Sequence, residues 1–297
     1  MTANQWTRSA EDYIGRSREE FLRKARRFQR AVSAKILNEW LPELSAIEGN
    51  IANNNSNLRA VNRLERIARE VSELEGAELA TWYVQRLQRL GTFTAGYYST
   101  LNIVEPIRLQ RAYQRAASSL LFRFGYDGEK FVRGGFLYDL TQANEPLRRI
   151  KSEAFRAIGN EQSFRDFMRS MKIFINGRTD VRQGLYENYF RTAAYDSFQQ
   201  FDRQINVNLA DELELDWAEY SGTTVERTRD FCDDKVGKAF HRSEIEAWSN
   251  QNWAGKNEPY DPFIDLGGYN CMHVLRWITA ERAAQLGRPE ALTERLQ

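Results

Sequence analysis

The chain has only two cysteines and two histidines, and all four lie in its last quarter. They are Cys232, His241, Cys271 and His273. Two thiolates and two imidazoles are a common ligand set of tetrahedral structural zinc sites. Cys271 and His273 are two residues apart, so in a strand their side chains would project from the same face. One interpretation is therefore a structural Zn²⁺ ion held by these four residues, whose binding free energy would contribute to folding.

Two other interpretations of these residues remain open. Cys232 and Cys271 could form a disulfide after release from the cell. Alternatively, both thiols could be buried for packing alone, with two hydrogen-bonded histidines near them, because cysteine is among the residues most often buried. A pair of cysteines is too few for a disulfide scaffold, so we expect synthesis in a reducing cytoplasm.

A catalytic role for this segment is less well supported by the sequence. Asn270 and His273 form an Asn-x-x-His pattern, one half of a His-Asn-His nuclease, and only His241 is left to act as the partner histidine. The surrounding pattern contains no recognisable ββα metal cradle. A Cys271–His273 nucleophile pair lacks an oxyanion-hole partner. We predict that the chain is not an enzyme and keep a metal-dependent hydrolase or nuclease as the alternative.

Short strands and helices are predicted around the four residues. The predicted strands cover residues 213–220 and 237–241, and residues 269–278 are expected to form a closing strand or a strand–helix junction. In the first of these, apolar and polar residues alternate with period two, which is typical of a half-buried strand. A short helix is expected at 243–248, with Ser243 as N-cap and Glu246 three residues later. A final helix is expected from Ala280.

The first two-thirds of the chain has the pattern of amphipathic helices. Apolar residues recur there at three- and four-residue spacing. Gly91 and Gly96 are expected to end one helix. Pro106 falls in the first turn of another, predicted over 103–124. The asparagine-rich tract 53–57 predicts a loop, because asparagine side chains compete for backbone hydrogen bonds.

The predicted fold is α+β and predominantly α. We expect a helical domain over residues 1–205, with subdivisions near 50–57 and 125–145. A small α+β domain with a few short strands is expected over 206–297, and it contains the Cys/His residues.

Charge and hydropathy exclude several classes of protein. The 42 basic residues, 34 Arg and 8 Lys, are balanced by 41 acidic ones, for a net charge of +1. A globally basic nucleic-acid binder is excluded, but local contact with DNA through arginine is not. No apolar run approaches the roughly 18 residues of a membrane helix. Residues 1–30 are polar and do not have the pattern of a signal peptide.

The C-terminal motifs resemble those of a known family. In order, they are a strand, Arg229-Asp230-Phe231-Cys232, Gly237-Lys238-Ala239-Phe240, a short helix with a tryptophan, Pro259, and Gly267-Gly268-Tyr269-Asn270-Cys271-Met272-His273. Over about residues 206–280 this order resembles the C-terminal domain of phage minor head proteins of the Mu F type, also called head morphogenesis proteins. Many relatives carry Cys-x-x-Cys at the first position, whereas here Cys232 is followed by Asp-Asp-Lys.

The resemblance implies a virion component without catalytic residues. Such a protein would be made in the host cytoplasm and located in the head interior or at the portal vertex. Its partners would be portal or capsid proteins, and further copies of itself if it forms an oligomer within the virion. It would assist head assembly, DNA packaging or DNA ejection. A balanced, helix-rich chain suits such an interaction protein, and its arginines would permit local contact with packaged DNA. A DNA-binding accessory protein is a further alternative.

Overall fold

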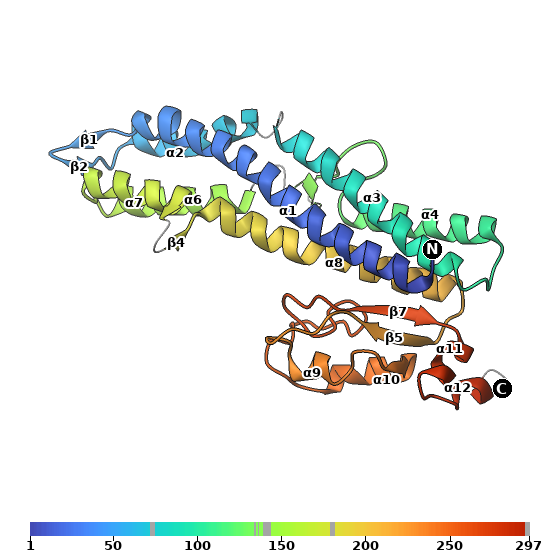
Figure 1. Ribbon diagram of the computed structural model, residues 1–297. Coiled ribbons are helices and arrows are strands. Elements are labelled where there is room, and N and C mark those ends of the chain that lie inside the picture. Colours follow the sequence, from blue (N-terminus) through green and yellow to red (C-terminus); the bar gives the residue numbers. More distant parts are fainter. Residues whose placement is uncertain (72–74, 134, 136, 139–143, 179–181, 295–297) are drawn as a thin grey trace. The chain divides into compact units, whose positions relative to one another are not determined.

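The computed structural model describes residues 1–71, 75–133, 135, 137–138, 144–178 and 182–294. The predicted fold class is confirmed, since the described chain is mainly helical with a few short strands (Figure 1). The long helices are α1 (Ala3–Lys35), α2 (Asn55–Val71), α3 (Ala77–Ser99), α4 (Pro106–Arg123), α6 (Asn144–Gly159), α7 (Phe164–Asn176) and α8 (Leu185–Glu212). A π-helical turn, Ile36–Trp40, and a 3₁₀ turn, Leu41–Glu43, follow α1.

Two compact units make up the chain, and neither is a continuous stretch of sequence. Unit 1 comprises Met1–Arg16, Arg86–Leu121 and Tyr195–Gln297, and unit 2 comprises Ser17–Gln85 and Phe122–Ala194. Helices α1, α3 and α8 each contribute residues to both units. The boundary predicted between residues 205 and 206 falls inside α8. The C-terminal residues therefore share a compact unit with parts of three long helices and α4.

Unit 2 is held together by aromatic side chains from α1, α3 and α8. Phe21, Phe28, Tyr83 and Phe190 are buried. The ring centroids of Phe21 and Tyr83 are 5.3 Å apart, and those of Phe28 and Phe190 are 5.6 Å apart, both in edge-to-face geometry. These aromatic residues therefore fill a core between helices, as the sequence pattern indicated.

The asparagine-rich tract of unit 2 is a loop only in its first half. After a short hairpin of β1 (Ala46–Ile47) and β2 (Asn50–Ile51), α2 begins at Asn55. The side chain of Asn54 accepts a hydrogen bond from the backbone of Asn57, as an N-cap does. The fully buried Asn57 amide donates to the carbonyls of Ser45 and Ala52. A second short hairpin joins β3 (Gly177–Arg178) and β4 (Arg182–Gln183).

In unit 1, α3 continues through both glycines that were expected to end it. A Cβ atom at Gly91 would lie 2.6 Å from the ring of Tyr113, and one at Gly96 would lie 2.7 Å from the ring of Trp6. The prediction of a helix end was therefore wrong, because these glycines allow α3 to pack closely against α4 and the start of α1. The helix predicted at 103–124 is confirmed as α4, with Pro106 as its first residue.

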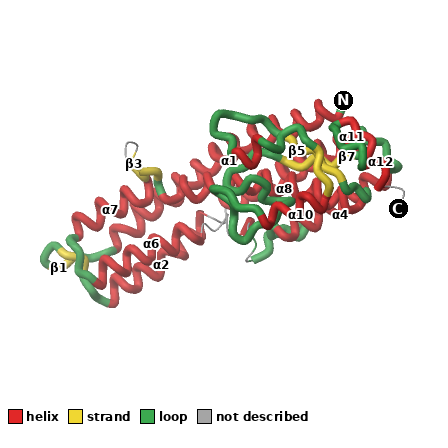
Figure 2. Tube along the Cα trace, turned by 90° about the horizontal axis from the view of Figure 1, so that it is seen from below, coloured by secondary structure: helices red, strands yellow, loops and turns green. Residues whose placement is uncertain are grey.

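A three-stranded antiparallel sheet forms the C-terminal part of unit 1. Its strands are β5 (Trp217–Ser221), β6 (Ala239–His241) and β7 (Val274–Ile278), in the order β6-β5-β7. The short helices are α9 (Asp230–Asp233), α10 (Arg242–Ala247), the 3₁₀ turn Trp248–Asn250, α11 (Ala280–Gln285) and α12 (Ala291–Glu294). Helices α9 and α10 cover one face of the sheet, and α8 lies on the other (Figure 1). Figure 2 shows β5 and β7 in yellow, with α11 and α12 beside them. All three strands predicted from the sequence are present, although each is shorter than predicted.

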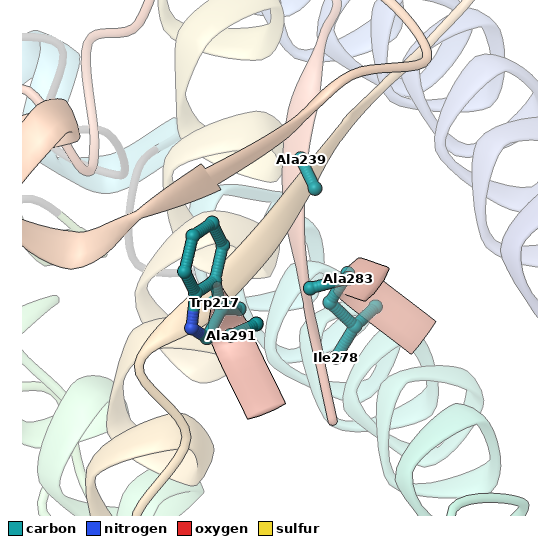
Figure 3. Packing of buried hydrophobic residues seen from close by; sticks show 5 residues of the cluster. All are labelled: Trp217, Ala239, Ile278, Ala283 and Ala291. Carbon is teal, nitrogen blue, oxygen red and sulfur yellow. The ribbon is translucent and has the colours of Figure 1, made fainter. Parts of the chain in front are cut away.

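A small apolar cluster attaches the last two helices to the sheet. Figure 3 shows Trp217 of β5 and Ile278 of β7 beside the alanines of β6, α11 and α12. Ala239, Ala283 and Ala291 are each at most 2% exposed. Their small side chains let α11 and α12 approach the sheet closely.

No helix among the described residues combines the length and the apolar character needed to cross a membrane.

Gly91→Ala tests the close contact of α3 with α4. The new methyl group would collide with the Tyr113 ring, so we expect a loss of about 1–3 kcal/mol in the free energy of unfolding. Gly15→Ala is the matched control, because Gly15 lies within α1 and a methyl group there would meet no neighbouring atom within 4 Å. The control should gain about 0.5–1 kcal/mol, as alanine favours helices over glycine. Urea unfolding measures both, and equal stabilisation by the two changes would contradict the packing explanation.

Candidate metal centre

Three of the four residues singled out from the sequence form one buried cluster in unit 1. The ligand atoms of Cys232, Cys271 and His273 all lie within 4.8 Å of one another. The two Sγ atoms are 4.0 Å apart, and Cys271 Sγ is 3.6 Å from His273 Nδ1. Both cysteines are free thiols, so the structure contains no Cys232–Cys271 disulfide. This group could bind a metal ion.

The three residues come from two different kinds of local structure. Cys232 lies in the single turn of α9, which the backbone of Arg229 precedes in extended conformation. Cys271 and His273 lie immediately before β7, after a turn at Asn270 with φ of +57°. They were expected to share a strand face, but the strand begins one residue later. Their side chains nevertheless point to the same cluster.

His241 is not part of this cluster. It ends β6, opposite Trp217 in the sheet, and its ring centroid is 5.2 Å from that of Trp217. Trp217 and Ser221 are at opposite ends of β5, and the cluster lies near the Ser221 end, roughly 13 Å further along the strand. His241 is also the N-cap of α10 and forms a capping box with Glu244. Ser243 was predicted for that role, but the helix starts at Arg242.

Two glycines make room for the cluster. A Cβ atom at Gly267 would lie only 2.2 Å from Cys232 Sγ and 3.2 Å from Cys271 Sγ. One at Gly222 would lie 2.6 Å from the ring of His273, and Gly222 also has a φ of +147°, which favours glycine. The backbone therefore approaches the thiols and the imidazole more closely than any residue with a side chain would permit.

Arg203 of α8 holds the segment that carries Cys271 and His273. Its guanidinium donates hydrogen bonds to the backbone carbonyls of Cys271, His273 and Ile264, over 2.6, 2.9 and 2.7 Å. Arg203 is buried. Among the described residues its hydrogen-bond partners are these three carbonyls, and none is a carboxylate. Its positive charge therefore lies beside the cluster without a hydrogen-bonded acidic side chain.

A second buried arginine ties β7 to α8. Arg276 of β7 pairs with Asp202, with 3.1 Å between Nη2 and Oδ2. Their side chains are 2% and 0% exposed. Arg276 also donates to Asn206, and Asp202 accepts a hydrogen bond from Thr94 of α3. The ion pair thus fixes the register of β7, and with it the residues just before that strand, against two helices.

A hydrogen bond couples the protonation of the two thiols. The hydrogen bond from Cys232, with further contributions from His273 and the charge of Arg203, lowers the pKa of the Cys271 thiol. The same hydrogen bond, together with burial, raises the pKa of Cys232. The first proton is therefore lost more readily from Cys271 than from Cys232. Burial also raises the pKa of Tyr220 well above its usual range, so this phenol is neutral.

A cavity of about 320 Å³ reaches the cluster, and all three candidate ligands line it. Glu11 of α1 lines it as well, and burial raises the pKa of this carboxyl group. His273 is 5% exposed, and its Nε2 atom has no hydrogen-bond partner among the described residues. A buried imidazole nitrogen without a partner is unusual in proteins.

Sequence reasoning did not identify Tyr220 or Arg203, although both touch the cluster. The hydroxyl of Tyr220 donates to Cys232 Sγ over 3.3 Å. Neither residue lies in a motif with Cys or His, because the sheet register and α8 bring them to the site. Comparisons with family models, curated proteins and solved structures found no match for this chain.

Asp202→Ala tests the buried ion pair. The change leaves Arg276 charged and unpaired in the interior, and we expect a loss of about 3–5 kcal/mol in the free energy of unfolding. The double variant Asp202→Leu with Arg276→Met replaces the pair by apolar groups and should lose much less. Urea unfolding measures both. A single variant that loses under about 1 kcal/mol would show that the pair does not hold β7.

Proposed function

We propose that this protein is a minor structural protein of a tailed-phage head, which binds the portal or the inner capsid and assists head assembly, DNA packaging or DNA ejection. The observation that carries the proposal is where its motifs meet in space. Cys232 and the closing Asn270-Cys271-Met272-His273 motif come together around one buried cluster. The Gly-Lys-x-aromatic turn leads into β6 of the same small sheet.

Within this proposal, the cluster is a structural zinc site. Tetrahedral zinc at ~2.3 Å from sulfur and ~2.0 Å from nitrogen places two sulfurs ~3.8 Å apart and a sulfur ~3.6 Å from a nitrogen. The corresponding distances are 4.0 Å between the two Sγ atoms and 3.6 Å between Cys271 Sγ and His273 Nδ1. The thiolate and imidazole donors also suit zinc. Cys232, Cys271 and His273 would hold the ion, which supplies a cross-link and no chemistry.

The proposed partners are proteins, with DNA contacts confined to local groups of arginines. The near-zero net charge supports protein partners with only local DNA contacts, because extensive DNA binding would need a strongly basic chain. On α1, Arg23, Arg26, Arg27 and Arg30 are all exposed. Guanidinium groups presented on a helix suit contacts with phosphates, and such contacts weaken steeply as salt rises.

One observation favours a second candidate, a metal-dependent hydrolase or nuclease. The cavity of about 320 Å³ reaches all three candidate ligands and also Glu11 and Arg229. Catalytic zinc sites have three protein ligands and an open fourth position, whereas structural sites are closed by a fourth ligand. The identity of the fourth ligand therefore separates the two candidates.

Zinc analysis of point variants tests the proposed metal site. We expect one zinc per chain in the purified protein. His273→Ala should weaken binding by more than about 100-fold, beyond what loss of an outer partner of a metal site costs. His241→Ala is the matched control, since His241 lies outside the cluster, and it should keep the metal. Atomic absorption and competition with a chelator measure both. Equal zinc content in the two variants would contradict the assignment of ligands.

Particle association tests the function itself. We expect the protein to band with heads and proheads purified from cells that express it together with the portal and capsid proteins of a tailed phage, in far fewer copies than the capsid protein. Quantitative mass spectrometry of the gradient fractions measures this ratio. The matched control is Gly15→Ala, which should assemble normally because its site is open. Absence from both heads and proheads, with the protein stable in the lysate, would overturn the proposal.

A further inference from the structure

Tyr220 places a fourth polar atom at the proposed metal site. This residue of β5 is fully buried. Its hydroxyl oxygen lies 3.3 Å from Cys232 Sγ and 3.9 Å from Cys271 Sγ. Its ring lies against that of His273, with centroids 5.3 Å apart. The phenol therefore contacts all three candidate ligands.

These distances match the edges of a tetrahedral ligand shell. With zinc ~2.0 Å from oxygen and ~2.3 Å from sulfur, an oxygen and a sulfur in the shell are ~3.5 Å apart. The two oxygen-to-sulfur distances of Tyr220, 3.3 and 3.9 Å, lie on either side of that value. Together with the sulfur–sulfur and sulfur–nitrogen distances, four edges of the shell are within about 0.4 Å of tetrahedral zinc geometry.

The charge next to the site also favours an anionic fourth ligand. A zinc ion bound by two thiolates and a neutral imidazole has no net charge, so the buried guanidinium of Arg203 would have neutral hydrogen-bond partners and no counter-charge among them. A phenolate as fourth ligand gives the site a charge of −1, which balances Arg203. Buried charges in proteins are usually paired in this way. Among the described residues, the hydrogen-bond partners of Arg203 are carbonyl oxygens, and none of them carries a charge.

The competing fourth ligand, a water molecule, would come from a different direction. It would have to enter through the cavity beside Asn270 and Met272. Tyr220 does not line that cavity. It reaches the cluster from β5 instead, because the strand's register places it opposite Leu275, beside the end of β7 that follows His273. The phenol is therefore already at the shell, with no movement of the backbone required.

We propose that Tyr220 is the fourth zinc ligand, bound through its phenolate oxygen, and that it closes the site formed by Cys232, Cys271 and His273. This inference rests on the proposed zinc site. Zinc binding would displace the phenol proton and the protons that the two thiols still hold, and all of these would pass to the solvent. With four protein ligands the site is structural, and no position is left for a reacting water.

The test is a zinc titration of the metal-free, full-length chain, followed by near-ultraviolet difference spectroscopy. Zinc is redox-inert, so a tyrosinate difference band reports a phenol whose proton has been displaced by the bound metal. We expect this band to grow until one equivalent of zinc has bound. In Tyr220→Phe it should be absent, and the zinc affinity should fall by about 100-fold or more, as for loss of a ligand rather than of an outer partner.

Tyr97→Phe is the matched control. Tyr97 is another buried tyrosine of unit 1, and its hydroxyl donates to the carbonyl of Trp277, not to the cluster. This variant should show the wild-type band and affinity. Circular dichroism checks that both variants fold. The tyrosinate band of the wild-type chain is measured without any substitution, so it tests the inference even where a variant does not fold.

Two results would overturn the inference, and they are distinguishable. If the wild type binds one zinc without a tyrosinate band, and Tyr220→Phe binds it equally well, the zinc site stands but Tyr220 is not its ligand. If the wild type binds no zinc, the proposed metal site fails together with this inference. Neither result bears on particle association, which is measured separately.

Discussion

The C-terminal part of unit 1 depends on two buried guanidinium groups, that of Arg203 on α8 and that of Arg276, which packs against α8. Arg203 holds the carbonyls of Cys271 and His273, and Asp202 holds Arg276 of β7. Charges are buried in proteins only when hydrogen bonds or opposite charges compensate for the lost hydration. The requirement for compensation therefore dictates where the segment 271–276 lies on α8. The positions of the candidate ligands follow from this, since two of the three belong to that segment.

This dependence explains why the C-terminal residues share a compact unit with helical segments. Every residue of β7 is buried, and a strand buried on both faces needs a partner on each. Helices α9 and α10 cover one face, and α8 covers the other. Tyr97 of α3 adds a hydrogen bond to the backbone of Trp277. A fragment that began near residue 206 would lack Asp202, Arg203 and α3. It would expose apolar strand residues and leave Arg276 without its carboxylate partner.

From the sequence, the secondary structure around the site could be predicted better than the set of residues that form the site. The strand and helix patterns were sufficient for β5, β6, β7 and α4, because each depends on periodicity within a few residues. The helix end predicted at Gly91 and Gly96 was wrong. A glycine that ends a helix and one that permits close helix packing cannot be distinguished until the neighbouring helix is known. His241 was predicted as a metal ligand but lies outside the cluster, for a related reason. A histidine near cysteines suggested a ligand, but its position opposite Trp217 in the sheet makes it a helix cap. Arg203 and Tyr220 carry no local signal at all.

The proposed zinc ion would cross-link a segment that has little regular secondary structure. Between α10 and β7 the chain runs through more than twenty residues, 251–273, without a regular helix or strand. Stacking of Trp253 on Phe231 and the hydrogen bonds of Arg229 to two backbone carbonyls hold part of it. Closing the loop between Cys232 and Cys271 would reduce the entropy of the unfolded chain, which adds stability to a segment that lacks the hydrogen-bond ladder of a regular helix or strand. The ion would thus stabilise an irregular surface that includes the exposed side chains of Tyr269 and Met272. An ordered, partly apolar surface of this type can bind a partner protein without first losing conformational entropy.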